Sequence, residues 1–262
     1  MFTLPLYDDN PIQRTPVATY AVIAACFAVF LWQVSLGPRV GQAILFSLGV
    51  IPAVLFGYVR LPTDLSLVPA PLSVLTSMFL HGGWMHLLGN MLYLWIFGNN
   101  VEDAMGRGRF LVFYLLCGAA AALAQSFADP LSRVPMIGAS GAIGGVLGAY
   151  LMLHPRANVR MLVVILFFIR LINVPAAIVL GLWFALQFIS GAMTPTESGE
   201  GGVAFWAHVG GFVAGVVLVP FFKRREVRLF DHPHSRPFAV MPPSAVTRRG
   251  SVPPAGNRRD WR

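Results

Sequence analysis

Six stretches of mostly apolar residues constrain this chain more than any other feature, because each is close to the length that crosses a bilayer. A membrane-spanning helix needs about 20 such residues, and lipid offers no partner to unpaired backbone groups. Only 11% of the residues are charged, whereas soluble domains have about 25%. We therefore predict an all-α polytopic membrane protein with six transmembrane helices, over residues 17–36, 84–100, 109–127, 139–153, 171–190 and 204–222.

A further apolar run, residues 42–59, is the main alternative to this count. Gly49, Pro52 and Gly57 interrupt it, so we interpret it as an interfacial or partly inserted loop. Residues 1–16 contain two adjacent aspartates and are not followed by a recognisable cleavage site. We expect them to be a cytoplasmic N-terminal segment rather than a signal peptide.

The net charge of +8 is distributed unevenly along the chain. Basic residues concentrate between the second and third stretches, between the fourth and fifth, and after the sixth: Arg107, Arg109, Arg156, Arg160, Arg170, Lys223, Arg224, Arg225 and Arg228. The opposite side contains Arg39, Arg60 and Arg133. This asymmetry predicts that both termini are cytoplasmic, and it argues against nucleic acid as the partner of the basic charge. Residues 223–262 are basic and Pro-rich, and are predicted to be a disordered tail.

The chain lacks the residues that several other classes of protein or site require. Cys26 and Cys117 lie in different apolar stretches without a CxxC spacing, which disfavours a disulfide or a metal site. The sequence contains no HExxH motif, so a zinc protease is disfavoured. No internal repeat is evident, which weakens an interpretation as a transporter built from inverted halves. We expect neither a metal ion nor a cofactor.

One serine and one histidine lie at the beginning of two apolar stretches. Ser140 is in a run of glycines and alanines that leaves its hydroxyl accessible, and His208 begins the last stretch. If the N-terminus is cytoplasmic, the second, fourth and sixth stretches all run from the outside to the inside. Ser140, His208, His86 and Asn90 then share one depth near the outer surface. Polar residues at one depth within a membrane indicate a functional site.

Helical spacing suggests how Ser140 and His208 could meet. Ser140 shares a helix face with glycines four and eight residues later, at 144 and 148. His208 shares a face with Gly211 and Gly215. Small residues at such spacing allow membrane helices to approach closely, which would bring the serine and the histidine within hydrogen-bonding distance. The alternative is that the glycines only pack helices, with Ser140 bonded to a backbone carbonyl.

The second stretch contributes two further polar residues. His86 and Asn90 are four residues apart and face the same way. Both can donate hydrogen bonds, which acyl transfer requires where negative charge develops on the carbonyl oxygen. His81, five residues before His86, is expected to brace its loop by hydrogen bonding rather than to react.

Several motifs occur together in a fixed order: His81-Gly82-Gly83-Trp84-Met85-His86-Leu87-Leu88-Gly89-Asn90, Glu102 after the second stretch, Gly138-Ala139-Ser140-Gly141, and Ala207-His208-Val209-Gly210-Gly211 with Gly215. With these motifs, residues 17–222 resemble the rhomboid intramembrane serine proteases. The resemblance implies a six-helix bundle and a dyad of Ser140 and His208 without a third acid. It implies an oxyanion site made by His86, Asn90 and the backbone N–H of Ser140. We also expect structural support from His81, Glu102, Gly144, Gly211 and Gly215.

The resemblance also implies what the protein acts on. We expect its substrates to be single-span membrane proteins that are cut within or just outside the membrane, with the lipid bilayer as its surroundings and no nucleic acid. A bacterial inner membrane is the expected location. The alternative is a non-proteolytic relative that binds membrane clients without cutting them. Such relatives usually lack the serine or the histidine, whereas this chain has both.

The chain departs from the family pattern at one position. Some members have a large aromatic residue four positions after the serine that stacks on the catalytic histidine, and here that position is Gly144. We expect His208 to be oriented by another residue, with Trp206 and Phe205 as candidates. Three aromatic residues of the fifth stretch either control access, together with the loop at 191–202, or face lipid: Trp183, Phe184 and Phe188.

Overall fold

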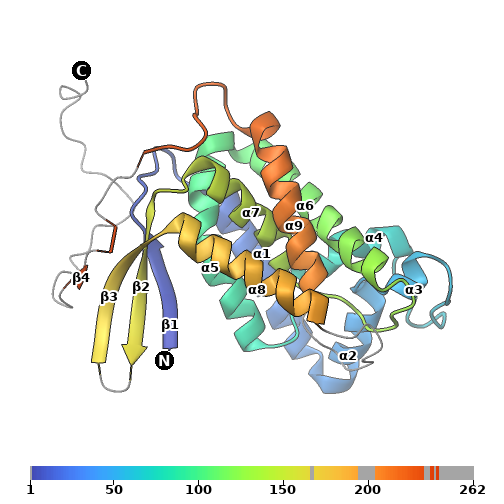
Figure 1. Ribbon diagram of the computed structural model, residues 1–262. Helices are drawn as coiled ribbons and strands as arrows, with labels where there is room; N and C mark the ends of the chain where they lie inside the picture. Colours follow the sequence, from blue (N-terminus) through green and yellow to red (C-terminus); the bar gives the residue numbers. More distant parts are fainter. Residues whose placement is uncertain (1, 166–167, 194–203, 233–236, 239, 242–262) are drawn as a thin grey trace.

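The computed structural model describes residues 2–165, 168–193, 204–232, 237–238 and 240–241, and it contains a helical bundle with a small sheet beside it (Figure 1). The long helices are α1 Val17–Ser35, α5 Trp84–Met105, α6 Arg107–Ala128, α7 Ser140–Leu153, α8 Ala176–Met193 and α9 Phe205–Phe222. The short helices are α2 Gly37–Leu48, α3 Pro52–Leu55, α4 Ala70–Thr76 and the 3₁₀ helix η1 Ser77–Phe79. The strands are β1 Phe2–Asp8, β2 Asn158–Ile165, β3 Phe168–Pro175 and β4 Val240–Met241.

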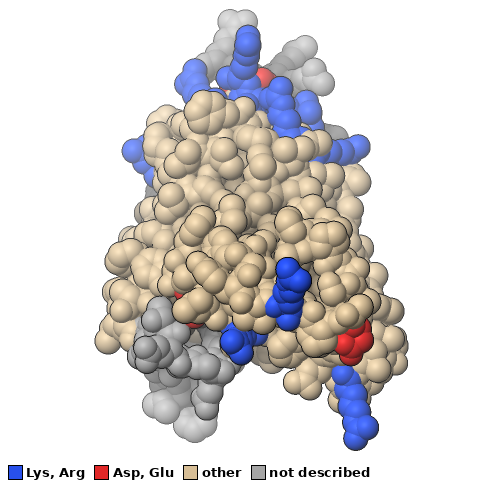
Figure 2. All heavy atoms as spheres, turned by 90° about the vertical axis from the view of Figure 1, so that its right-hand side faces the viewer, with Lys and Arg blue, Asp and Glu red and all other residues tan. Residues whose placement is uncertain are grey.

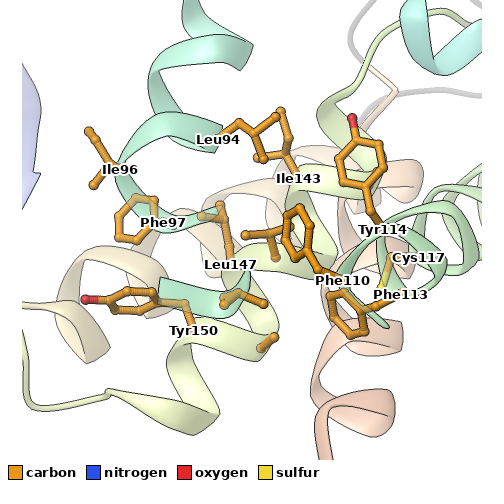
Figure 3. Packing of buried hydrophobic residues seen from close by; sticks show 14 of the residues in the cluster. Leu94, Ile96, Phe97, Phe110, Phe113, Tyr114, Cys117, Ile143, Leu147 and Tyr150 are labelled. Atoms are coloured by element: carbon orange, nitrogen blue, oxygen red, sulfur yellow. The ribbon is translucent and has the colours of Figure 1, made fainter. Parts of the chain in front are cut away.

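Helix α7 is the most enclosed element of the bundle. It contacts α5, α6 and α9, and nearly all of its residues are buried. Figure 3 shows part of this core, where Leu147 and Tyr150 of α7 lie near Phe97 of α5 and Phe110 of α6. A helix that is apolar all round is expected in such a position, because it has no face that favours water. The packing therefore fixes the helix that begins with Ser140.

Four helices in the described part of the chain are long and apolar enough to cross a membrane: α1, α6, α8 and α9. Helix α7 has only 14 residues, and α5 has two acidic residues in its last turns. The predicted apolar stretches and the observed helices agree closely in their bounds, except for the fifth stretch. Four spans are supported by length and composition, and the count of six stays a prediction.

The fifth stretch begins differently from the prediction of a helix over residues 171–190. Residues 171–175 form the end of β3, and α8 begins at Ala176 and continues to Met193. Proline has no N–H for a strand ladder or a helix interior, so Pro175 suits the junction between the two elements. The run is apolar on both sides of this proline, and apolarity alone does not distinguish a buried strand from a helix.

The sheet was not predicted, so the expectation of an all-α protein is wrong for these segments. Its order is β1-β2-β3-β4 and its neighbouring strands are antiparallel. Strand β1 pairs with β2 from Phe2 opposite Val164 to Asp8 opposite Val159. The two long strands β2 and β3 are rich in valine, isoleucine and leucine, which suit a pleated surface. Part of the expected N-terminal segment is thereby fixed to the folded protein.

Asp8 is the main polar link between the sheet and the bundle. Its Oδ2 atom accepts hydrogen bonds from the Tyr150 hydroxyl at 2.5 Å and from the Asn100 side-chain amide at 2.7 Å. Removal from water, together with the nearby negative charge of Asp9, raises the pKa of Asp8 to about 7, although the hydrogen bond from Tyr150 opposes this shift. A large fraction of Asp8 is therefore protonated at neutral pH.

We expect the Asp8 proton to contribute stability that is lost as the pH rises from about 4 to about 7. The unfolded chain releases the Asp8 proton near pH 3.8, whereas the folded protein holds it until about pH 7. The contribution of this proton to the free energy of unfolding is thus complete below the pKa of the unfolded chain, and it is lost as the pH rises through the pKa of the folded protein. Asp8→Asn cannot titrate, so thermal unfolding in detergent should show a Tm that falls less over this range, by on the order of a few degrees. Equal falls in both proteins would contradict the assignment to Asp8.

The beginning of the predicted tail is folded against the ends of the helices. The backbone N–H of Arg224 donates to a carbonyl of α5 at 2.9 Å, and its guanidinium pairs with a carboxylate of the same helix at 3.7 Å. The N–H groups of Phe230 and Asp231 donate to carbonyls at the end of α7, each at 2.9 Å. Residues 223–232 therefore differ from the disorder that we predicted, and residues 242–262 lie outside the described part.

On the face that Figure 2 shows, charged side chains are concentrated at the two ends. Figure 2 shows Lys and Arg gathered at one end, a few at the opposite end, and a broad belt of other residues between them. Basic residues occur where α9 ends and where α6 begins, at Lys223 and Arg107. The pattern agrees with the charge asymmetry of the sequence, and the assignment of this end to the cytoplasm stays a prediction.

Residues 42–59 form no helix of membrane-spanning length. They contain the end of α2, an isolated bridge between Val50 and Met136, and α3. Helix α2 has 12 residues, which is too short to cross the hydrocarbon core. The structure agrees with a loop-like segment, and its insertion into lipid stays a prediction.

Candidate active site

Ser140 and His208 are in direct contact. Ser140 is the first residue of α7, and His208 lies in the first turn of α9. The Nε2 atom of His208 is 2.9 Å from the Oγ atom of Ser140. The serine and the histidine are 68 residues apart in sequence, and the fold brings them together as the shared depth and the glycine faces suggested.

Glycines allow α7 and α9 to touch along their backbones. A Cβ atom at Gly211 would overlap the carbonyl oxygen of Gly141, and one at Gly215 would overlap the carbonyl oxygen of Gly145. Backbone atoms cannot rotate away as flexible side chains can, so even alanine at either position requires the helices to separate. The close approach at Gly211 lies next to the contact between Ser140 and His208.

Gly144 faces the backbone of His208. A Cβ atom there would lie 2.9 Å from the carbonyl oxygen of His208, so α7 has no room for the aromatic residue of other family members. The structure gives the imidazole other partners than the expected Trp206 or Phe205. The indole of Trp206 packs against Phe188 instead, with ring centroids 5.7 Å apart.

Within the described part of the chain, the other hydrogen-bond partner of the His208 ring and an aromatic neighbour come from α8. The Nδ1 atom of His208 is 2.7 Å from the Oε1 atom of Gln187. The indole of Trp183 lies beside the imidazole, with ring centroids 5.8 Å apart and planes tilted by 35°. The sequence analysis missed Gln187. The available signal was a polar residue inside an apolar stretch, four positions after a tryptophan and thus on the same helix face.

His86 and Asn90 lie against the loop that leads into α7. A Cβ atom at Gly138 would be 2.8 Å from Nε2 of His86 and 3.7 Å from Nδ2 of Asn90. The backbone N–H of Gly82 donates to Nδ1 of His86 at 3.4 Å, which leaves the ring hydrogen on Nε2. The Nδ2 atom of Asn90 is buried and has no hydrogen-bond partner in the described part of the chain. Two side-chain donors therefore lie beside the segment that precedes Ser140.

The backbone around Ser140 supplies further donors. The first N–H groups of α7 have no acceptor within the helix, and they carry the positive end of its dipole. Gly138 has a φ of +119°, and a Cβ atom there would meet His86, so this position requires glycine. A small cavity of about 30 Å³ lies beside Ser140, lined also by Ser77, Gly141 and Ala207. It is large enough for one water molecule.

His81 and Glu102 both fix neighbouring segments. The backbone N–H of His81 donates to Oε1 of Gln33 at 3.1 Å, and the Gln33 amide donates to the His81 carbonyl at 3.3 Å. This pair holds the loop before α5 against α1. The buried carboxylate of Glu102 accepts the backbone N–H of Thr19 at 2.7 Å, that of the preceding residue at 3.0 Å, and the Thr19 hydroxyl at 2.8 Å. It thereby satisfies the free donors at the start of α1.

Comparison with known families identifies the fold around this site. The family model for the rhomboid domain matches residues 70–225, which is more than half of the chain. The chain belongs to the rhomboid family. Four described helices of this rhomboid are long and apolar enough to cross a membrane, which fits a multi-pass membrane protein.

Individual rhomboids match parts of the chain. It is 31% identical over 155 residues to "Rhomboid protein 1, mitochondrial" of Saccharomyces cerevisiae, covering 57% of this chain and 41% of that protein. It is 46% identical over 78 residues to "Rhomboid protease GluP" of Bacillus subtilis, covering 30% of this chain and 15% of that protein. It is 29% identical over 147 residues to "Rhomboid-related protein 2" of Mus musculus, covering 55% and 45%. These matches span less than half the length of each relative.

Proposed function

We propose that this rhomboid is an intramembrane serine endopeptidase, with Ser140 as nucleophile and His208 as general base. The observation that carries the proposal is the 2.9 Å contact between Ser140 Oγ and His208 Nε2. A serine hydroxyl is a weak nucleophile until an adjacent base accepts its proton. The contact lies at the first turns of two helices, where the glycine faces of α7 and α9 hold it in position.

The chemistry that we propose is acyl transfer from a peptide bond. His208 Nε2 takes the Ser140 proton while the oxygen attacks the peptide carbonyl carbon, and the carbonyl oxygen becomes an oxyanion. Its hydrogen-bond donors are the backbone N–H of Ser140, Nε2 of His86 and Nδ2 of Asn90. His208 then gives its proton to the leaving amine, which leaves an acyl group on Ser140. A water molecule, activated by the same histidine, hydrolyses this ester and restores the serine.

The proposed substrates are single-span membrane proteins, cut within or near the membrane. An intact helix keeps its carbonyls in internal hydrogen bonds, so a substrate segment must be locally unwound before Ser140 can attack it. Helix-breaking and small residues near the cut should therefore favour cleavage. The small cavity beside Ser140 supports hydrolysis, because it can hold one water molecule next to the acyl group.

The proposal includes six spans in a bacterial inner membrane, with both termini in the cytoplasm and Ser140 toward the outside. The uneven placement of lysine and arginine supports the orientation. The relatives in Bacillus subtilis agree with a bacterial membrane, whereas the yeast relative is named as mitochondrial.

The experiment that tests this function uses purified protein in liposomes with a generic single-span membrane protein. We expect two fragments, whose new ends map by mass spectrometry within or near the apolar segment of the substrate. Ser140→Ala protein of the same thermal stability is the control and should leave the substrate intact. Stable binding of the substrate by the wild-type protein without any cut would favour a non-proteolytic role instead.

A second prediction concerns the oxyanion donors. His86→Ala and Asn90→Ala should each lower kcat by ~10²-fold or more while KM changes little, because donors to the oxyanion act mainly in the transition state. Michaelis–Menten analysis of substrate cleavage in liposomes measures both constants. Met85→Ala is the control, because Met85 lies on the same helix with 83% of its surface exposed. Wild-type kcat in both donor variants would remove α5 from the mechanism.

A further inference from the structure

The imidazole of His208 is held at both of its nitrogen atoms. Nε2 is 2.9 Å from Ser140 Oγ, and Nδ1 is 2.7 Å from Oε1 of Gln187. An amide oxygen can only accept a hydrogen bond, so the contact requires a hydrogen on Nδ1. Nε2 then has the free lone pair that can take the serine proton. The hydrogen bond to Gln187 thereby selects the tautomer that serves as a base toward Ser140.

We propose that Gln187 of α8 is a positioning residue for His208. The proposal rests on the proteolytic function given above and extends it to a third polar side chain and a third helix. Rotation about the Cβ–Cγ bond of histidine has a broad torsional preference. The contact with Ser140 therefore does not by itself fix the plane of the ring. A second hydrogen bond on the opposite nitrogen removes this freedom.

Trp183 supports the same assignment from an independent contact. It lies four residues before Gln187, so both side chains project from one face of α8. Its indole lies beside the imidazole at a tilt of 35°, with ring centroids 5.8 Å apart, and its ring centroid is 6.2 Å from that of Phe212 of α9. Gln187 and Trp183 therefore both contact the imidazole from α8.

The backbone of α7 explains why α8 has this role. At Gly144 of α7, a Cβ atom would lie 2.9 Å from the carbonyl oxygen of His208, so α7 cannot place a side chain over the ring without moving α9. Both contacts that orient the imidazole therefore come from α8. When His208 takes the serine proton, the resulting positive ring still donates from Nδ1 to Gln187. This hydrogen bond should be stronger in the transition state than in the resting protein, because the donor is then a positively charged ring.

The test compares three variants at one position of the full-length protein in liposomes. Gln187→Leu has a similar size and no acceptor, Gln187→Asn keeps the amide and is one methylene shorter, and Gln187→Glu keeps an acceptor at the same reach. We expect the leucine and asparagine variants to lose on the order of 10-fold to 100-fold in kcat with little change in KM. The glutamate variant should recover most of the loss. Leu186→Ala is the matched control, because Leu186 neighbours Gln187 and is 53% exposed.

Two further readouts separate positioning from general stability. The rate at which a fluorophosphonate labels Ser140 should fall with kcat, while the Tm in detergent should change little. If Gln187→Leu does not fold, Gln187→Asn provides the same comparison with the amide retained.

Wild-type kcat in a folded Gln187→Leu or Gln187→Asn protein would overturn the positioning role and leave the protease function intact. An equal loss in the glutamate variant at unchanged Tm would overturn it as well. A wild-type protein that neither cleaves nor labels would overturn both proposals.

Discussion

Replacing Ser140 with alanine should lower the rate of substrate cleavage by ~10⁴-fold or more while the protein stays folded. The reason is that the Oγ atom is the group that would form the covalent bond, and it is 2.9 Å from the base. His208→Ala should lower the rate by a similar factor, because the effects of replacing residues that act as one catalytic unit are not additive. The double variant should therefore be hardly slower than either single variant. Cleavage rates in liposomes, corrected for the amount of folded protein, measure all three.

A matched serine variant controls for the loss of a hydroxyl. Ser126 is buried within α6, outside the candidate active site, and Ser126→Ala removes the same hydroxyl group from another helix of the bundle. It should retain cleavage within a few-fold of wild type. Appreciable cleavage by well-folded Ser140→Ala protein would contradict the assignment of Ser140 as nucleophile.

Adding one methyl group at Gly211 should destroy activity without touching a catalytic side chain. The Cβ atom of Gly211→Ala would overlap the carbonyl oxygen of Gly141, so α7 and α9 must separate. A displacement of ~1 Å can cost 10²-fold in rate, and overpacking should lower the stability by ~1–3 kcal/mol. Cleavage and fluorophosphonate labelling report the separation of Ser140 from His208, and thermal unfolding in detergent reports the packing.

Gly89 provides the control for this substitution. It is a helical glycine of α5, between His86 and Asn90 in sequence, and a Cβ atom there would have nothing within 4 Å. Gly89→Ala should leave cleavage close to wild type and should not lower the Tm, because alanine favours a helix over glycine. A Gly211→Ala protein with normal labelling and a normal Tm would contradict the close approach of α7 and α9 along this face.

The sequence predicted most of the long helices and the contact between Ser140 and His208 because both depend on simple patterns. Long apolar runs in lipid form helices, and glycines at spacings of three and four residues mark the faces that meet. Ser140 and His208 then followed from their equal depth in two stretches of the same direction. His86 and Asn90 followed from the same depth and from their shared helix face.

The remaining features depend on contacts between segments that are distant in sequence. The pairing of β1 with β2 joins residues that are distant in sequence, such as Phe2 and Val164, and an apolar strand such as Asn158–Ile165 looks like part of a helix until its partner is known. The sequence marks Gln187 as a polar residue in an apolar helix but does not identify its partner, because such a residue has many possible partners. Its contact with His208 follows from how α8 packs on α9, which no local pattern of residues encodes.

The central claim is that His208 activates Ser140 for attack on a carbonyl group. The most direct measurement is identification by mass spectrometry of the residue that a fluorophosphonate modifies in the wild-type protein and in His208→Ala. Such a reagent reacts with an activated serine and leaves a stable phosphonyl ester on its oxygen. We predict near-stoichiometric modification of Ser140 in the wild-type protein and a labelling rate at least ~10²-fold lower in His208→Ala. Modification of another serine, or equal labelling of Ser140 in both proteins, would contradict this account.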